Sequence, residues 1–96
     1  MAVAANTYRN FIDGEWVDSE SGEHFENTNP ATGELIGSFP RSTASDADRA
    51  VAAAHQAYQS WRLYPAPKRA EILFRVAELL RVRKPELTRT MTREMG

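Results

Sequence analysis

The sequence has no cysteine among its 96 residues, and it has no long apolar run. The absence of cysteine excludes disulfides, thiolate metal sites and a thiol nucleophile within these residues, and it leaves the redox compartment undetermined. No apolar run approaches the roughly 18 residues of a membrane-spanning helix. The first five residues carry no basic side chain and their apolar run stops at Asn6, which does not fit a signal peptide. We therefore expect a soluble, cytoplasmic chain without a membrane partner.

Residues that commonly carry chemistry are also scarce. The five glycines are too scattered for a phosphate-binding loop, and neither a zinc-protease helix motif nor a Gly-x-Ser-x-Gly elbow is present. His55 lies beside the apolar arc of a predicted helix, so we interpret it as a boundary residue. His24, between Glu23 and Glu26, could in principle bind a metal, but one imidazole and two distant acids do not fix a geometry. The composition and spacing therefore predict no catalytic and no cofactor-binding residue.

The charges are unevenly distributed along the chain. Residues 1–61 hold nine acidic and three basic side chains, whereas residues 62–96 hold nine basic and four acidic ones. Such asymmetry can mark nucleic-acid binding. The arginines of the second part are interrupted by Glu71, Glu78 and Glu86, which is typical of a solvated or docked helix face. We therefore expect no nucleic-acid partner. The aromatic side chains that could stack on bases are assigned to packing instead: Trp16, Tyr58, Trp61 and Tyr64.

Two amphipathic helices dominate the pattern, over residues 43–61 and 66–84. At about 100° per residue, the apolar side chains of the first fall within an arc of roughly 120°. Those of the second spread over roughly 220°, from Ala70 to Leu80, although about 100° is enough to seat a surface helix. The first helix is therefore expected to bury one stripe. The second should be covered from two directions, and this chain offers too little to cover it.

The remaining residues predict short strands and one more helix. Residues 1–7 are expected to be a flexible tail, and residues 8–96 a partial domain that opens with an antiparallel meander over 8–40. Asp13-Gly14 suits a two-residue hairpin turn that needs positive φ at both positions. Asn29–Gly33 is a strong turn signal, and Thr43 with Asp46 has the form of a capping box. Pro85 either stops the second helix or opens a short third helix over 85–95.

Several local patterns follow one another in a familiar order. Together they resemble the N-terminal region of the NAD(P)-dependent aldehyde dehydrogenase superfamily, over about residues 8–96. No single motif is decisive, whereas their order and spacing are. The motifs are Phe11-Ile12-Asp13-Gly14-Glu15-Trp16-Val17, Asn29-Pro30-Ala31-Thr32-Gly33-Glu34, Asp46–Ala54, Trp61-Arg62, Lys68-Arg69, Val76-Ala77-Glu78-Leu79-Leu80 and Glu94-Met95-Gly96.

The resemblance implies an α+β fragment: short antiparallel strands with a hairpin, then two or three helices, as in the N-terminal part of the family's cofactor-binding domain. Full-length members oxidise an aldehyde to a carboxylic acid through a cysteine thiohemiacetal and hydride transfer to NAD(P)+. Their catalytic cysteine, glutamate and asparagine lie beyond the stretch matched here. The resemblance therefore implies a chain that is inactive alone and binds neither NAD, NADP nor aldehyde by itself.

The implied partners are the remainder of an aldehyde dehydrogenase chain and, in the whole enzyme, further copies in a homo-oligomer. The family's pattern continues with Lys-Pro after Gly96, so the resemblance also implies a fragment. A second interpretation does not require the remainder of an enzyme. In it, the chain is a free-standing remnant that acts as an interaction or assembly module through its apolar helix. That reading would be weakened if Ile72, Phe74 and Leu79 were all buried inside a monomer.

One site is implied by the resemblance. Some family members hold a monovalent cation with carbonyl oxygens just before the Asn-Pro turn and with an acid of the terminal Glu/Asp-x-Gly motif. The matching positions are Asn27, Thr28 and Glu94. Ligands that are all oxygen suit a hard cation. Alternatively, Glu94 caps the third helix or pairs with a basic side chain near it.

Overall fold

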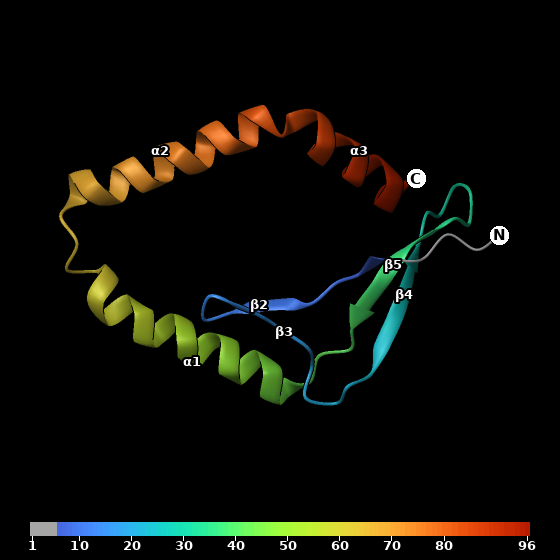
Figure 1. The fold of residues 1–96 in the computed structure, drawn as a ribbon, viewed down its shortest axis with the longest axis horizontal. Helices are drawn as coiled ribbons and strands as arrows, with labels where there is room; N and C mark the ends of the chain where they lie inside the picture. Colours follow the sequence, from blue (N-terminus) through green and yellow to red (C-terminus); the bar gives the residue numbers. More distant parts are fainter. Residues whose placement is uncertain (1–5) are drawn as a thin grey trace.

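The computed structural model describes residues 6–96, and these form an α+β chain of five short strands followed by three helices (Figure 1). This order confirms the fold class that the sequence predicts. The elements are β1 (Asn6–Thr7), β2 (Asn10–Ile12), β3 (Glu15–Val17), β4 (His24–Thr28), β5 (Leu35–Pro40), α1 (Ala44–Trp61), α2 (Ala66–Val82) and α3 (Lys84–Met95).

The strands form two separate sheets, so the single meander predicted over residues 8–40 is wrong. β2 and β3 make an antiparallel hairpin, while the second sheet has the order β1-β5-β4, with β1 parallel to β5. The tail expected over residues 1–7 is also too long: residues 1–5 lie outside the described part, but Asn6 and Thr7 pair with Gly37 and Ser38. This pairing needs a glycine, because a Cβ on Gly37 would lie 2.8 Å from the carbonyl oxygen of Asn6.

The turns follow the local chemistry of the sequence. Asp13 and Gly14 have φ values of 52° and 76°, as the hairpin turn between β2 and β3 requires. Between β4 and β5, the side-chain oxygen of Asn29 accepts a hydrogen bond from the main-chain N–H of Ala31 at 2.9 Å. Gly33 takes a φ of 75° in the same turn. Both turn predictions are confirmed.

The helices lie within two residues of their predicted bounds. Thr43 is the N-cap of α1, and the predicted capping box with Asp46 is present. Residue Arg83, with φ −90° and ψ 8°, separates α2 from α3. Pro85 explains the break, because it has no N–H to donate to the carbonyl oxygen of Arg81. Proline is accepted in the first turn of a helix, so the same residue that ends α2 opens α3.

The carboxylate of Asp46 joins the start of α1 to the loop before β4. The residue is 2% exposed. Its oxygens accept hydrogen bonds from the main-chain N–H groups of Thr43 at 2.8 Å and Glu20 at 3.0 Å, and from the guanidinium of Arg49 at 3.0 Å. The bond from the main-chain N–H of Thr43 is the largest influence, and together these donors hold the pKa of Asp46 below its ordinary 3.8, against the opposing effect of burial.

This arrangement predicts an acid-sensitive junction. Because the folded pKa of Asp46 is lowered, its stabilisation is present above the unfolded value of 3.8 and is lost as the pH falls through the folded value. We expect Asp46→Asn to lower the midpoint of thermal unfolding at neutral pH. Between about pH 5 and pH 2, the midpoint of this variant should fall less steeply than that of the unsubstituted chain. Circular dichroism at 222 nm measures both effects. The control is Asp48→Asn, which removes an exposed acid two residues farther along α1. If this variant reduces the pH dependence of the midpoint equally, Asp46 is not responsible.

The chain is open and lacks a common core. Among residues 6–96, Ile36 is the one buried hydrophobic residue. The radius of gyration is 17.1 Å, whereas a compact domain of this length has about 13 Å. Figure 1 shows why: α1, α2 and α3 run in an open ring that the β4–β5 sheet closes, and the hairpin projects into it alongside α1. The stripe that α1 was expected to bury is largely exposed, since Asp46 is its one buried residue and Tyr58 is 52% exposed.

Candidate functional site

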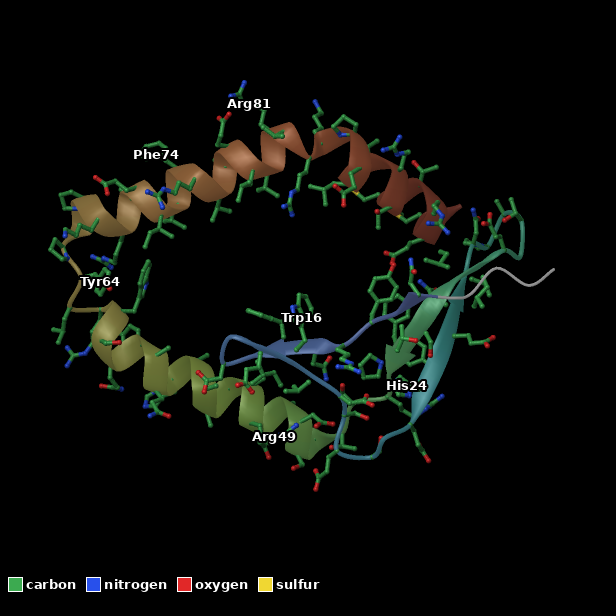
Figure 2. The ribbon with its side chains drawn as sticks, viewed as in Figure 1. Trp16, His24, Arg49, Tyr64, Phe74 and Arg81 are labelled. Atoms are coloured by element: carbon green, nitrogen blue, oxygen red, sulfur yellow. The ribbon has the colours of Figure 1, made fainter. Side chains whose placement is uncertain are left out.

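The largest feature without a partner in the described chain is α2. None of its residues is buried. Ile72, Phe74 and Leu79 are 40%, 74% and 53% exposed, so the helix meets the sequence prediction that it would lack sufficient cover. Figure 2 shows Phe74 on the outer side of the ring, together with Arg81, so apolar surface faces outward as well as inward. Contiguous apolar surface of this kind is rare on monomeric soluble proteins and is typical of an interaction surface.

The two ends of α2 are held, while its middle is free. At its start, the rings of Trp61 and Tyr64 stack with centroids 5.7 Å apart across the turn from α1. Beyond its end, α3 returns to the sheet: the guanidinium of Arg93 lies 3.9 Å from the carboxylate of Glu34, and a Cβ on Gly96 would lie 3.0 Å from the Pro30 ring. The helix therefore spans the ring between two attachments, as Figure 1 shows.

A second exposed apolar surface lies on the hairpin. The rings of Phe11 and Trp16 contact each other with centroids 4.9 Å apart, although the residues are 60% and 66% exposed. Figure 2 shows Trp16 on the side of the hairpin that faces α2 rather than α1. On the α1 side, Ala47 and Ala50 line a shallow hollow with Phe11 and Ile12. The hairpin thus covers part of the small-residue face of α1 and leaves its own aromatic side open.

The two histidines lie on β4 and α1. The Nε2 atom of His24 lies 3.1 Å from the Asp18 carboxylate, and His55 is exposed on α1. Within residues 6–96, no group of three or more His, Cys, Asp or Glu side chains is placed to hold a metal. None of the described helices is both long and apolar enough to cross a bilayer.

The three residues of the expected cation site come from β4 and α3. A β-bulge lies between Asn27 and Thr28, whose ladder partners are Gly37 and Leu35. Glu94 lines a small hollow with Ile36, the residue between those two partners. Across residues 6–96 no ion pair involves Glu94. The extra residue of this bulge is Ile36 on β5, because Asn27 and Thr28 both keep ladder partners. The structure therefore brings Glu94 close to the bulged residue of β5.

Comparison with known proteins identifies what this arrangement belongs to. The model of the "Aldehyde dehydrogenase family" matches residues 16–96. The chain belongs to the aldehyde dehydrogenase family. It is 45% identical over 96 residues to malonate-semialdehyde dehydrogenase 1 of Geobacillus thermodenitrificans, and 42% identical over 92 residues to the alpha-ketoglutaric semialdehyde dehydrogenase of Bacillus subtilis. This aldehyde dehydrogenase chain spans 20% and 19% of those two relatives, at their N-terminal end.

Solved aldehyde dehydrogenases share the fold. A 3,6-anhydro-L-galactose dehydrogenase in complex with NADP is 33% identical, with a TM-score of 0.90 over 95% of this chain and 19% of the other. The Mycobacterium tuberculosis aldehyde dehydrogenase in complex with NAD+ is 35% identical, with a TM-score of 0.78 over 90% of this chain and 18% of the other. The open ring is therefore the shape that this segment has inside complete aldehyde dehydrogenases.

One residue of this aldehyde dehydrogenase segment escaped the sequence reasoning. Arg69 and Ala70 are the two residues of α2 that are half-buried rather than exposed. The Nε atom of Arg69 is buried without a hydrogen-bond partner among residues 6–96. The helical wheel contained a signal for it, because Arg69 falls inside the apolar arc rather than opposite to it.

Proposed function

We propose that this chain acts as the N-terminal segment of an NAD(P)+-dependent aldehyde dehydrogenase and is inactive by itself. The observation that carries the proposal is its uncovered surface. The chain exposes 8015 Å², whereas a compact protein of 10.8 kDa exposes about 5,500 Å². The excess of about 2,500 Å² is what one partner contributes to a large obligate interface. The relatives, of which this chain spans a fifth, supply a covering partner of sufficient size.

In the proposed enzyme this segment has a scaffolding role. The complete protein would oxidise an aldehyde to a carboxylic acid through a cysteine thiohemiacetal, and the relatives' names favour a semialdehyde that carries a second carboxylate. NAD or NADP and the aldehyde would bind the remainder of the chain, because this segment has no cysteine nucleophile and no phosphate-binding loop. The assembly would be a cytoplasmic homo-oligomer in which α2 lies under the rest of the protein.

Two proteins test this proposal. The hybrid carries residues 1–96 of this chain in place of the first fifth of the Geobacillus thermodenitrificans malonate-semialdehyde dehydrogenase 1; the truncated relative is the same enzyme without its first fifth. We expect an active hybrid and binding of the separate chain to the truncated relative. If the chain instead formed a stable oligomer that buries α2 and did not bind the truncated relative, the alternative function, a free-standing assembly module, would be supported.

We propose further that Asn27, Thr28 and Glu94 hold a monovalent cation in the assembled enzyme. The position of Glu94 supports this, since it lines a hollow with Ile36, the β5 residue that lies between the ladder partners of Asn27 and Thr28. The neighbouring Arg93 does not compete for the acid, because its guanidinium is directed at Glu34. The donors are oxygen atoms alone, which suits Na+ or K+ rather than a transition metal.

The cation proposal is tested by ion replacement in the hybrid. We expect the midpoint of thermal unfolding to be higher in K+ or Na+ than in tetramethylammonium at equal ionic strength, because a bound ion stabilises the folded state. Glu94→Gln should remove that difference, since a neutral amide loses the charge that attracts the ion. The control is Glu86→Gln, an exposed acid on the same helix. If Glu94→Gln keeps the difference between the salts, Glu94 is not a ligand.

A further inference from the structure

Arg69 lies where a charge is least expected on α2. At about 100° per residue, its direction falls between those of Val76 and Leu80, with Ile72 and Leu73 farther out on either side. The other charged side chains of α2 beyond its first turn lie outside this sector: Glu71, Arg75, Glu78 and Arg81. Arg69 is therefore the single charge at the centre of the apolar face.

The side chain of Arg69 is already partly shielded from water in the chain by itself. Its Nε–H is buried and has no acceptor among residues 6–96. By contrast, the guanidinium of Arg81 on the outer side is paired with Glu78 at 2.6 Å and is 74% exposed. A buried N–H without an acceptor is rare in native proteins and calls for a partner that the described residues do not provide.

Covering the apolar face would remove the remaining water from Arg69. A guanidinium stays charged at any physiological pH, so it cannot escape the cost of burial by losing a proton. A charge buried in this way is tolerated when an opposite charge pairs with it and satisfies its N–H groups. Arginine at the centre of an interface is also a residue type on which binding commonly depends.

We infer that Arg69 is the polar anchor of the α2 interface, and that the covering segment presents a carboxylate to its guanidinium. This inference rests on the proposed function, because the covering segment is taken to be the remainder of the aldehyde dehydrogenase. The carboxylate fits the charge of the surface as well: residues 62–96 carry nine basic and four acidic side chains. The planar guanidinium allows a two-pronged contact, which fixes the register of α2 on its partner.

The test measures binding of the separate chain to the truncated relative. We expect Arg69→Met to weaken binding about tenfold or more, because it leaves a buried carboxylate unpaired. The matched control Arg75→Met, on the exposed polar side of the same helix, should stay within about twofold of the unsubstituted chain. Arg69→Gln, which keeps N–H donors but not the charge, should bind as weakly as Arg69→Met.

Four results would overturn the inference. Equal affinity of Arg69→Met and Arg75→Met would show that no acceptor faces Arg69, and full affinity of Arg69→Gln would show a neutral acceptor instead of a carboxylate. Loss of helical signal from the isolated Arg69→Met chain would show a role inside this chain. If the unsubstituted chain does not bind the truncated relative, both the proposed function and the role of Arg69 are wrong. If the unsubstituted chain binds but the Arg69 variants bind equally well, only the role of Arg69 is wrong.

Discussion

Oxidation of malonate semialdehyde with NAD+ should be undetectable with the 96-residue chain or the truncated relative alone, and it should appear in the hybrid. The chain alone has no cysteine to act as the nucleophile. The truncated relative would expose the surface that the missing segment covers. In the hybrid, a segment 45% identical to the one it replaces should restore that cover.

The measurement is NADH formation at 340 nm, with the complete Geobacillus enzyme as the reference. A matched control is the same hybrid with its nucleophilic cysteine replaced by alanine, which should fold and show no turnover. The mass of the hybrid in solution should equal that of the reference oligomer. Turnover by the separate 96-residue chain would contradict the proposal, as would a folded hybrid that lacks activity while the reference is active.

Val76→Asn should weaken binding of the chain to the truncated relative about a hundredfold or more, whereas Val82→Asn should have little effect. Val76 lies beside Arg69 on the apolar face, and Val82 lies on the polar side of the same helix. Both valines are exposed in the chain by itself, at 45% and 66%. Covering Val76 removes an apolar side chain from water, which favours binding. Covering asparagine in its place buries a polar amide, which opposes binding, so the binding free energy changes by about 3 kcal/mol.

The pair is matched in side chain and lies on one helix, with Val76 in its interior and Val82 as its last residue. Binding is measured by titration calorimetry, with circular dichroism of each separate chain to show that both variants keep their helices. A similar loss from both substitutions would indicate a general effect on α2. A loss from Val82→Asn alone would place the covered face on the opposite side of the helix.

Local chemistry made much of the fold readable in advance. The Asp13-Gly14 turn, the Thr43 cap and the break at Pro85 each depend on interactions within a few residues, so their sequence patterns determine them. The width of the apolar arc of α2 is likewise a property of the helix alone, and it correctly indicated a helix without enough cover. The cation residues Asn27, Thr28 and Glu94 rested on resemblance, and they stay a proposal.

Pairing between residues that are distant in the sequence could not be predicted from local sequence patterns. The strands separate into two sheets, and Asn6 and Thr7 join β5 in parallel across some thirty residues, because Gly37 lets the chains approach closely. The stripe of α1 was predicted to be buried, but no described element lies over most of it. Periodicity shows which side of a helix is apolar, whereas burial depends on whether another surface arrives there.

The sequence by itself determined the helices, the turns, the family and the presence of an apolar helix without enough cover, because each is encoded in contacts or spacings along the chain. Only the tertiary structure decided that the helices surround the hairpin as an open ring, that the Asp46 carboxylate joins Glu20 to α1, and that the Nε–H of Arg69 is buried without an acceptor. These depend on groups far apart in the sequence, whose distances and access to water are fixed when the chain folds.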